Sequence, residues 1–214
     1  MKGVFPPRTV GLFLALTATL LLGARFAAFS IEANGDQQVD LATGVTTLPR
    51  GGTLTDNQNG LRLVAPYIQY KDGEFIRARQ AQFSTGETRF IALELDYQFK
   101  GETVRLKGLT VSSPDFSSIS AQEGLALLGE NRLVLSGNIR SQAPQLKAGK
   151  MVVDTQSRQA LVIGAYTFQD GANRLSGNRP DSLLLLSFQG GKTQVTTRVP
   201  PEVLARLRPY ADKL

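Results

Sequence analysis

The sequence predicts an all-β fold of stacked antiparallel hairpins, with a hydrophobic N-terminal helix and a short C-terminal helix. The apolar residues that open successive units lie 28, 28, 27 and 29 residues apart, at Leu63, Ile91, Ile119, Leu146 and Leu175. Within each unit apolar and polar residues alternate, which is typical of half-buried strands. Turns such as KDGE, KGE and QGGK separate these runs and suit tight hairpins. A fixed period of this length indicates one hairpin unit stacked on itself.

Residues 1–30 are expected to be a signal peptide or a membrane anchor. Basic Lys2 and Arg8 precede an apolar run of about 14 residues, from Val10 to Gly23. This run is shorter than the roughly 20 residues needed to span a bilayer, so it fits a signal peptide. If uncleaved, residues 10–29 would reach spanning length and hold the chain at a membrane. Both alternatives place the rest of the chain on the far side of that membrane.

Composition narrows the possible functions. The 214-residue chain has no Cys and no His, which excludes disulfides, thiolate nucleophiles, Cys/His zinc sites and imidazole bases. The formal net charge is +6, but residues 1–30 carry three basic and no acidic side chains. The remainder therefore has 21 basic and 18 acidic residues, or +3. These charges are scattered, which is weak support for nucleic-acid binding. We expect no cofactor, no metal site and no nucleic-acid partner.

Three regions follow the hydrophobic segment. Residues 31–60 are rich in Gly, Asn, Asp and Thr and predict a tether followed by irregular first strands. Residues 61–199 hold the repeats and form the predicted β domain. Residues 200–214 predict a short helix that caps an open end of the sheet, because a proline suits the first helical turn and Leu204 with Leu207 gives a narrow apolar stripe. Docking to a partner or to a membrane is the alternative role of this helix.

A glycine recurs at a matched place in three units. Gly108, Gly137 and Gly164 occupy this place, with Ala81 in the first unit. A small residue repeated inside a strand marks a bend or a close backbone approach. If these bends are in register, every hairpin folds into a V and the stack becomes a trough. Ordinary bulges without a shared role are the alternative.

The best-preserved repeat carries a family signal. A strand ending in Gly137-Asn138 precedes the pattern L-x-A-x-x-x-x-x-D, a polar turn and a Gly-containing strand, at Leu146, Ala148, Asp154 and Gly164. This stretch of about 45 residues, Leu133–Gly177, resembles the OstA-like repeat of the lipopolysaccharide-transport proteins LptA and LptC. The resemblance implies a V-shaped β-jelly roll, or β-taco. It also implies a periplasmic protein that carries lipopolysaccharide or a similar glycolipid towards the outer membrane, anchored like LptC or free after signal cleavage like LptA.

A V-shaped stack would line its inside with the inward residues of each strand. In an open groove, the acyl chains of a lipid would gain roughly 0.8 kcal/mol per buried CH₂ while the headgroup stays outside. In a closed one, the same residues form an ordinary core, and both alternatives stand. The predicted lining is Leu93, Leu95, Val104, Leu106, Leu125, Leu127, Leu133, Leu135, Ile139, Met151, Val153, Leu161 and Ile163. No residue is predicted to be catalytic.

An open stack also has two exposed strand edges, which we expect near Leu61–Tyr70 and near Thr193–Val199. Unpaired edges recruit other strands unless charges or other elements cover them. These edges would join the protein to related envelope transport proteins, or to copies of itself, by strand addition. The alternative is that basic side chains and the C-terminal helix blunt them.

Two other functions compete with lipid transport. A structural or adhesive β-solenoid of the cell envelope would show the same repeats with a filled core. A hydrolase would need two carboxyl groups in one water-excluding pocket. The candidate pairs are Asp154 with Asp170 and Glu94 with Asp96, but their places in turns and on outward strand positions favour solvated surface charge. We therefore expect a binding protein without enzymatic activity.

Overall fold

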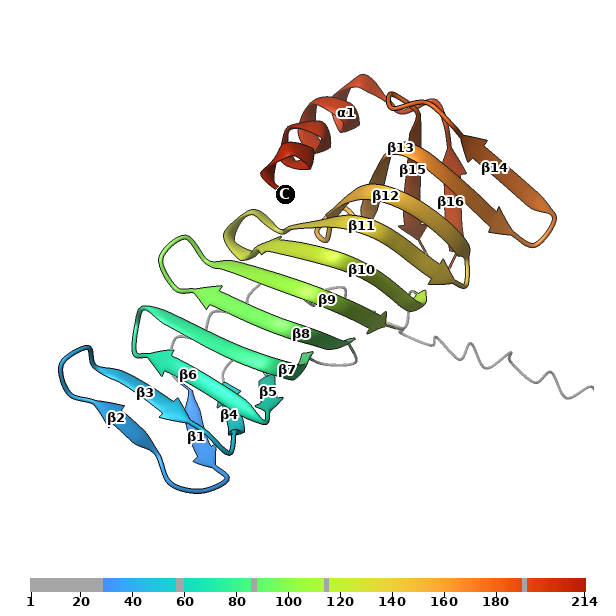
Figure 1. The fold of residues 1–214 in the computed structure, drawn as a ribbon. Helices are drawn as coiled ribbons and strands as arrows, with labels where there is room; N and C mark the ends of the chain where they lie inside the picture. The colour runs from blue at the N-terminus through green and yellow to red at the C-terminus, as the bar shows by residue number, and fades with distance from the viewer. Residues whose placement is uncertain (1–28, 57–59, 86–87, 114–115, 190–191) are drawn as a thin grey trace, which may run out of the picture.

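The computed structural model describes residues 29–56, 60–85, 88–113, 116–189 and 192–214. The expected signal peptide or anchor lies almost entirely outside these ranges. Within them, one sheet of 16 strands makes up most of the chain and a short helical segment ends it (Figure 1). Neighbouring strands pair antiparallel throughout. The predicted all-β fold of stacked hairpins is confirmed.

The strands are long in the middle of the sheet and short at both of its ends. In chain order they are β1 (Ser30–Ala33), β2 (Gln38–Asp40), β3 (Val45–Leu48), β4 (Gly52–Asp56), β5 (Leu61–Ala65), β6 (Tyr67–Lys71), β7 (Phe75–Thr85), β8 (Thr88–Gln98), β9 (Thr103–Ser113), β10 (Phe116–Leu127), β11 (Arg132–Gln142), β12 (Gln145–Asp154), β13 (Gln159–Asp170), β14 (Asn173–Gly177), β15 (Leu183–Gln189) and β16 (Lys192–Thr196). The helical segments are η1 (Leu128–Glu130), α1 (Pro201–Leu207) and η2 (Arg208–Lys213), of which η1 and η2 are 3₁₀ turns.

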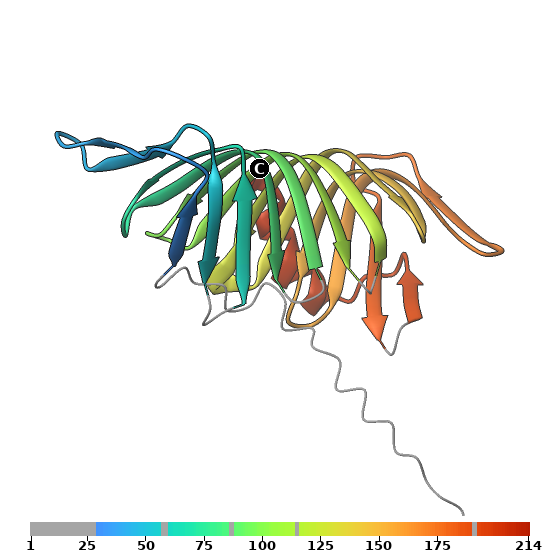
Figure 2. The same ribbon diagram turned by 90° about the horizontal axis from the view of Figure 1, so that it is seen from below.

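The seven long strands, β7 to β13, bend in the middle and give one half to each of two arms (Figure 2). The first arm begins with β2, β3 and β6, continues through residues 75–79 of β7 and their partners, and ends with β15 and β16. The second arm begins with β1, β4 and β5, continues through residues 81–85 of β7 and their partners, and ends with β14. The sheet is therefore V-shaped in section, with one inner and one outer face.

The arms meet along a line of backbone irregularities. Gly108, Gly137 and Gly164 all have positive φ, at 58°, 74° and 90°. The pairing of β11 with β12 shifts register between Ser136 and Ile139, which encloses the second of these glycines. A Cβ at Gly137 would also lie 2.3 Å from Gln122 Oε1, so this position lacks room for a side chain. The repeated glycines thus lie at the bend of the V.

The sequence predicted the edge strand correctly at one end of the sheet and wrongly at the other. Residues 31–60 contribute to four short strands, β1 to β4, where we expected a tether followed by irregular first strands. As a result Leu61–Tyr70, the expected first edge, is interior, because β5 pairs with β4 and β7 while β6 pairs with β3 and β7. The N-terminal edges are instead β1 and β2. At the other end the edge strands are β14 and β16, and β16 lies in the expected region.

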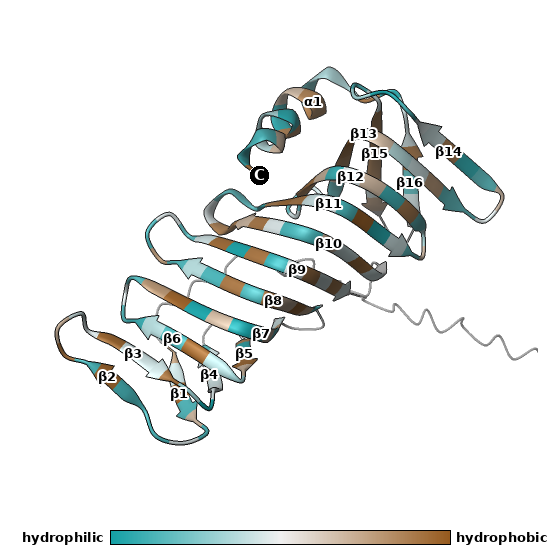
Figure 3. Ribbon diagram, in the orientation of Figure 1, coloured by the Kyte–Doolittle hydropathy of each residue, from teal (hydrophilic) through white to brown (hydrophobic). Residues whose placement is uncertain are grey.

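Two apolar clusters lie on opposite faces of the first arm. The larger cluster fills the inside of the V and takes residues from every long strand, for example Leu106, Leu135 and Phe168. The smaller cluster lies on the outer face of the first arm, around Val134 and Val152, beneath α1 and η2. Hydropathy therefore alternates along most strands (Figure 3), whereas β10 to β13 and β15 are apolar on both faces within the first arm.

The C-terminal helix covers a face of the sheet and does not cap its open end as expected. α1 and η2 pack on β11 and β12, where Val203, Leu207 and Ala211 are buried. The helix lies there because the outer face of these strands is apolar and is removed from water by this contact. Of the predicted stripe, Leu207 is fully buried and Leu204 is partly exposed. No helix in the described part of the chain is long and apolar enough to cross a membrane.

A buried ion cluster fixes the helix to the first arm. Asp154, at the end of β12, is only 1% exposed. Arg132 Nη1 of β11 lies 2.9 Å from Asp154 Oδ1, and Arg206 of α1 is ion-paired with Asp154 Oδ2. The backbone N–H groups of Gln156 and Ser157 donate to Asp154 Oδ1 at 3.0 and 3.1 Å. The carboxylate is thereby surrounded by donors, as a buried charge requires.

A second, more exposed contact holds η2. The Glu130 carboxylate accepts hydrogen bonds from the Tyr210 hydroxyl and, at 3.2 Å, from Lys213 Nζ. The hydrogen bond from Tyr210 is the largest cause that lowers the pKa of Glu130, and the same bond raises the pKa of Tyr210. Lys150 Nζ of β12 donates to the backbone oxygen of Leu214 at 3.1 Å. The helical segment is thus tied to η1, β11 and β12 through Arg206, in the last turn of α1, and through η2 and the C-terminal residue.

Candidate binding site between the arms

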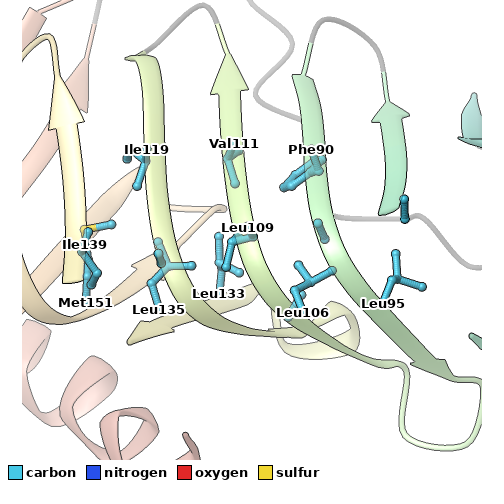
Figure 4. Packing of buried hydrophobic residues seen from close by; sticks show 14 of the residues in the cluster. Phe90, Leu95, Leu106, Leu109, Val111, Ile119, Leu133, Leu135, Ile139 and Met151 are labelled. Atoms are coloured by element: carbon cyan, nitrogen blue, oxygen red, sulfur yellow. The ribbon is translucent and has the colours of Figure 1, made fainter. Parts of the chain in front are cut away.

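The inside of the V is lined by apolar side chains from both arms. Leu106 and Leu135 of the first arm and Phe90, Leu109 and Ile139 of the second arm point into the same interior (Figure 4). The cluster extends from β3 and β4 at one end of the stack to β15 at the other. The inner surface is therefore one continuous apolar strip that runs the length of the sheet.

Eight of the thirteen residues predicted to line a groove lie in this interior. Six of them are at most 7% exposed, and the two valines are partly buried. The structure brings these eight into one cluster, and contact of any of them with a lipid is a proposal taken up below. They are Leu95, Val104, Leu106, Leu133, Leu135, Ile139, Met151 and Val153.

The other five predicted residues lie elsewhere. Leu93, next to the bend, is 62% exposed. Successive strand residues face opposite sides, so a shift of one position moves a whole set from the inner to the outer face. In the first-arm halves of β10 and β13 the residues of both faces are apolar, so the sequence does not indicate which of them point into the V. In β13 the inward residues are Ala160 and Val162. Four residues instead lie on the outer face of the first arm, under the C-terminal helix: Leu125, Leu127, Leu161 and Ile163.

Sequence reasoning missed most of the second arm, from which it named only Ile139. The bend explains the omission, because extra residues there break the period of two. Inward residues on either side of the bend in β9 are three positions apart, at Leu106 and Leu109, which breaks the period. In β11 they are four apart, at Leu135 and Ile139, which keeps the period, so Ile139 was found. The inward residues of the second arm could be found by restarting the alternation after each bend. The inward residues that were missed include Leu63, Phe83, Phe90, Leu109, Val111, Ile119, Leu146 and Phe168.

The interior is nearly closed. Near the middle of the stack, side chains from both arms surround a cavity of about 30 Å³. By the same measure a cavity needs roughly 10–15 Å³ to hold one water molecule, so this space has room for only a few waters. Phe83 and Phe90 line it from the second arm, with ring centroids 5.2 Å apart, and Leu95, Tyr97 and Val104 are among the lining residues of the first. The side chains described around this cavity therefore pack against each other across the middle of the V.

Apolar side chains become partly exposed along the mouth of the V. Phe99, Val104, Val153 and Phe188 lie near the free rim of the first arm, and Phe83 lies near the rim of the second. All five pack against the inner cluster while remaining accessible. Partly exposed apolar side chains therefore lie on both sides of the mouth, four near the rim of the first arm and Phe83 near the rim of the second.

The carboxylate pairs considered for catalysis do not form a pocket. Glu94 and Asp96 lie on the outer face of the first arm, where Glu94 Oε2 is 2.8 Å from Lys107 Nζ and Asp96 Oδ2 is 3.1 Å from Arg77 Nε. The hydrogen bond from Lys107 lowers the pKa of Glu94, which keeps it charged. Asp154 is buried at the rim of the first arm, whereas Asp170 ends β13 on the second. No group of three or more acidic residues in the described ranges is arranged to hold a metal.

Comparison with known proteins adds a likeness to solved structures. No protein-family model and no curated protein matches the sequence. Among solved structures, the chain is similar to LptH from Pseudomonas aeruginosa, described as the LptA-homologous periplasmic component of the lipopolysaccharide transport device. The sequences are 14% identical, the match covers 83% of this chain and 98% of that chain, and the TM-score is 0.29. A likeness this weak carries no argument about function, and the fold stands on the strand pairing described above.

Proposed function

We propose that this protein binds the acyl chains of lipopolysaccharide, or of a similar amphipathic envelope lipid, between the two arms of the V and passes it across the periplasm towards the outer membrane. The observation that carries the proposal is the continuous apolar strip inside the V, bordered by partly exposed apolar residues along its mouth. The resemblance of Leu133–Gly177 to the OstA-like repeat supports the same lipid class. No catalytic group is needed for this function.

The energetics favour exchange of one apolar contact for another. Opening the arms exposes inner side chains that now bury each other, which costs about 25 cal/mol per Å² of apolar surface. An acyl chain laid between the arms covers the same surface and buries its own CH₂ groups, each worth roughly 0.8 kcal/mol. The line of bends at Gly108, Gly137 and Gly164 gives the sheet one place where the angle between the arms can change.

Strand edges offer the contacts for transfer between proteins. β1 and β2 at one end and β14 and β16 at the other each have one unpaired side in the described sheet. Addition of a strand from a related envelope protein, or from a second copy, would extend both the sheet and its apolar interior. The N-terminal residues 10–29 either anchor the domain to the inner membrane or are removed with a signal peptide, and N-terminal sequencing of the exported protein distinguishes the two.

A photo-crosslinking experiment in lipopolysaccharide-producing cells tests the proposal. A benzoylphenylalanine probe is placed at two inward positions, Leu106 and Phe90, and at their outward neighbours Arg105 and Ile91. Ile91 is a matched control, because it is apolar and 55% exposed on the outer face. We expect lipid adducts at both inward positions and none at the outward ones.

The same experiment addresses the competing function. A structural β-solenoid with a permanently filled core would give no lipid adduct at any position. Native mass spectrometry of the purified protein would then show no bound lipid and no mass shift with added lipopolysaccharide. That combination would overturn the proposal and favour the solenoid.

A further inference from the structure

The outer face of the second arm is basic. Its strands present Arg62, Arg89, Arg140, Lys147 and Arg174 outward, and all five are exposed. The only acidic residue that the described strands put on this face is Glu32, on β1. None of the five cations has a described carboxylate within 4.0 Å. Among the described residues, this face therefore carries net positive charge without ion-pair partners.

Two of these cations are placed directly opposite each other. Arg140 of β11 and Lys147 of β12 are register partners. Like charges at this position destabilise a sheet. In the described strands no other register pair joins two charges of the same sign, and the first arm pairs Arg77 with Asp96. Arg140 Nε donates only to the neutral Asn138 Oδ1, at 3.0 Å. A bound anion would offset the repulsion between Arg140 and Lys147.

The pair lies in a hollow with further polar groups. One cross-strand row runs from Ser120 through Arg140, Lys147 and Thr167 to Ser176. The row lines a surface hollow on strands β10 to β14, and the volume of this hollow is about 950 Å³. The neighbouring outward row adds the amides of Gln142, Gln145 and Gln169 and the guanidinium of Arg174. Cations thus lie at the centre of the hollow, with hydroxyl and amide groups on either side.

We infer that this hollow binds an anionic saccharide, one whose sugar rings carry phosphate or carboxylate groups. Arg140 and Lys147 take the anionic group, since guanidinium and ammonium groups form charge-assisted hydrogen bonds with it. The flanking hydroxyls and amides take the ring hydroxyls. The lining also includes Leu146, Phe168 and Leu175, but these side chains belong to the inner cluster. Among the side chains that the structure describes, those that face outward in the hollow include no aromatic ring on which a nucleobase could stack and no apolar group to insert into a bilayer, which disfavours those partners.

This site is separate from the interior of the V. The row faces away from the apolar strip, and the site needs no opening of the arms. It therefore stands or falls independently of the proposed lipid transport. A protein that fails to crosslink lipid could still bind the saccharide, and the reverse also holds.

The test is a binding titration with the full chain in neutral phosphatidylcholine nanodiscs. The probe is a fluorescein-labelled oligogalacturonate, a carboxylated saccharide, followed by anisotropy. Unlabelled oligogalacturonate should compete, whereas maltotetraose, its uncharged counterpart, should not. Competition by inorganic phosphate or by phosphatidylglycerol vesicles at least as effective as by the unlabelled saccharide would show a general anion or membrane surface and would overturn the inference.

Matched variants distinguish the hollow from diffuse charge. The double variant Arg140→Gln/Lys147→Gln should weaken binding by at least about tenfold, because it removes both charge-assisted hydrogen bonds to the anionic group. Arg62→Gln/Arg89→Gln removes the same charge from the same face outside the hollow and should change binding less than about twofold. An equal loss in both double variants would overturn the inference.

A third variant separates binding from folding. Lys147→Glu turns the like-charge pair into an opposite-charge pair, so the melting temperature should rise while saccharide binding is lost. Circular dichroism should show an unchanged β spectrum. Retained binding in this folded variant would also contradict the inference.

Discussion

The two arms of the V share their long strands and their apolar interior, yet their outer faces differ. On the first arm, ion pairs such as Arg77 with Asp96 and Lys107 with Glu94 neutralise the strands, and a helix covers the apolar remainder. On the second arm, the described strands carry basic, hydroxyl and amide groups that nothing covers. In both arms, the inward side chains must be apolar because they pack against each other inside the V. Packing leaves the outer faces free to differ, and the saccharide site inferred above lies on the uncovered outer face of the second arm.

Truncation of inner side chains should have the largest effect, and it should be equal in the two arms. Leu135→Ala in the first arm and Phe168→Ala in the second should each lower the free energy of unfolding by about 3 kcal/mol, since both side chains are 1% exposed and leave a cavity. Urea denaturation measures both values. Leu93→Ala, at a 62% exposed position, is the control and should cost less than about 0.5 kcal/mol. A small effect at only one of the two inner positions would contradict a shared interior.

The ion cluster beneath the helix should show the next largest effect, confined to the first arm. Asp154→Asn leaves Arg132 and Arg206 without their shared anion in a buried site and should cost about 3 kcal/mol in urea denaturation. Asp96→Asn breaks an exposed pair on the same face and should cost less than about 0.5 kcal/mol. Proteolysis should remove residues 200–214 faster from the first variant. Equal stability of the two variants would show that the cluster does not hold the helix.

Acid should loosen the helix through Glu130. Its pKa is lowered from the ordinary value of 4.5, so its contribution is fully present above that value and is lost as pH falls through the lower pKa of the folded state. The contribution should be under about 1 kcal/mol, because the side chain is 46% exposed. Melting temperatures between about pH 3 and 6 should fall more steeply for the wild type than for Glu130→Gln. Parallel curves would exclude this role.

The smallest expected effect is a gain in stability on the second arm. Lys147→Glu should raise the free energy of unfolding by about 0.5 kcal/mol, because it replaces a like-charge pair with an opposite-charge pair. On the first arm, Lys107→Glu should act in the opposite sense and lower the melting temperature, since it faces Glu94. Differential scanning calorimetry of both variants checks the signs. A stability change of the same sign in both variants would contradict the proposed difference in charge pairing between the two arms.

Much of the fold could be predicted from local sequence. The period near 28 residues, the alternation within each unit and the turn residues predict stacked hairpins, because each depends only on neighbours along the chain. Gly108, Gly137 and Gly164 stood out because a bend with positive φ favours a residue without Cβ. The edge at β16 was also predicted. β1 to β4 were expected only as irregular strands after a tether, because these short strands lie in a region rich in turn residues.

The sequence by itself determined the all-β fold, the repeat and the positions of the bends. Only the tertiary structure decided which face each strand presents. Leu133 and Leu161 occur in similar runs, yet one lies inside the V and the other under the helix, because β11 and β13 are apolar on both sides near these residues. The structure also decided that Arg140 and Lys147 meet on one uncovered face. That pairing depends on the register between two strands, and neither residue's own neighbours along the chain encode it.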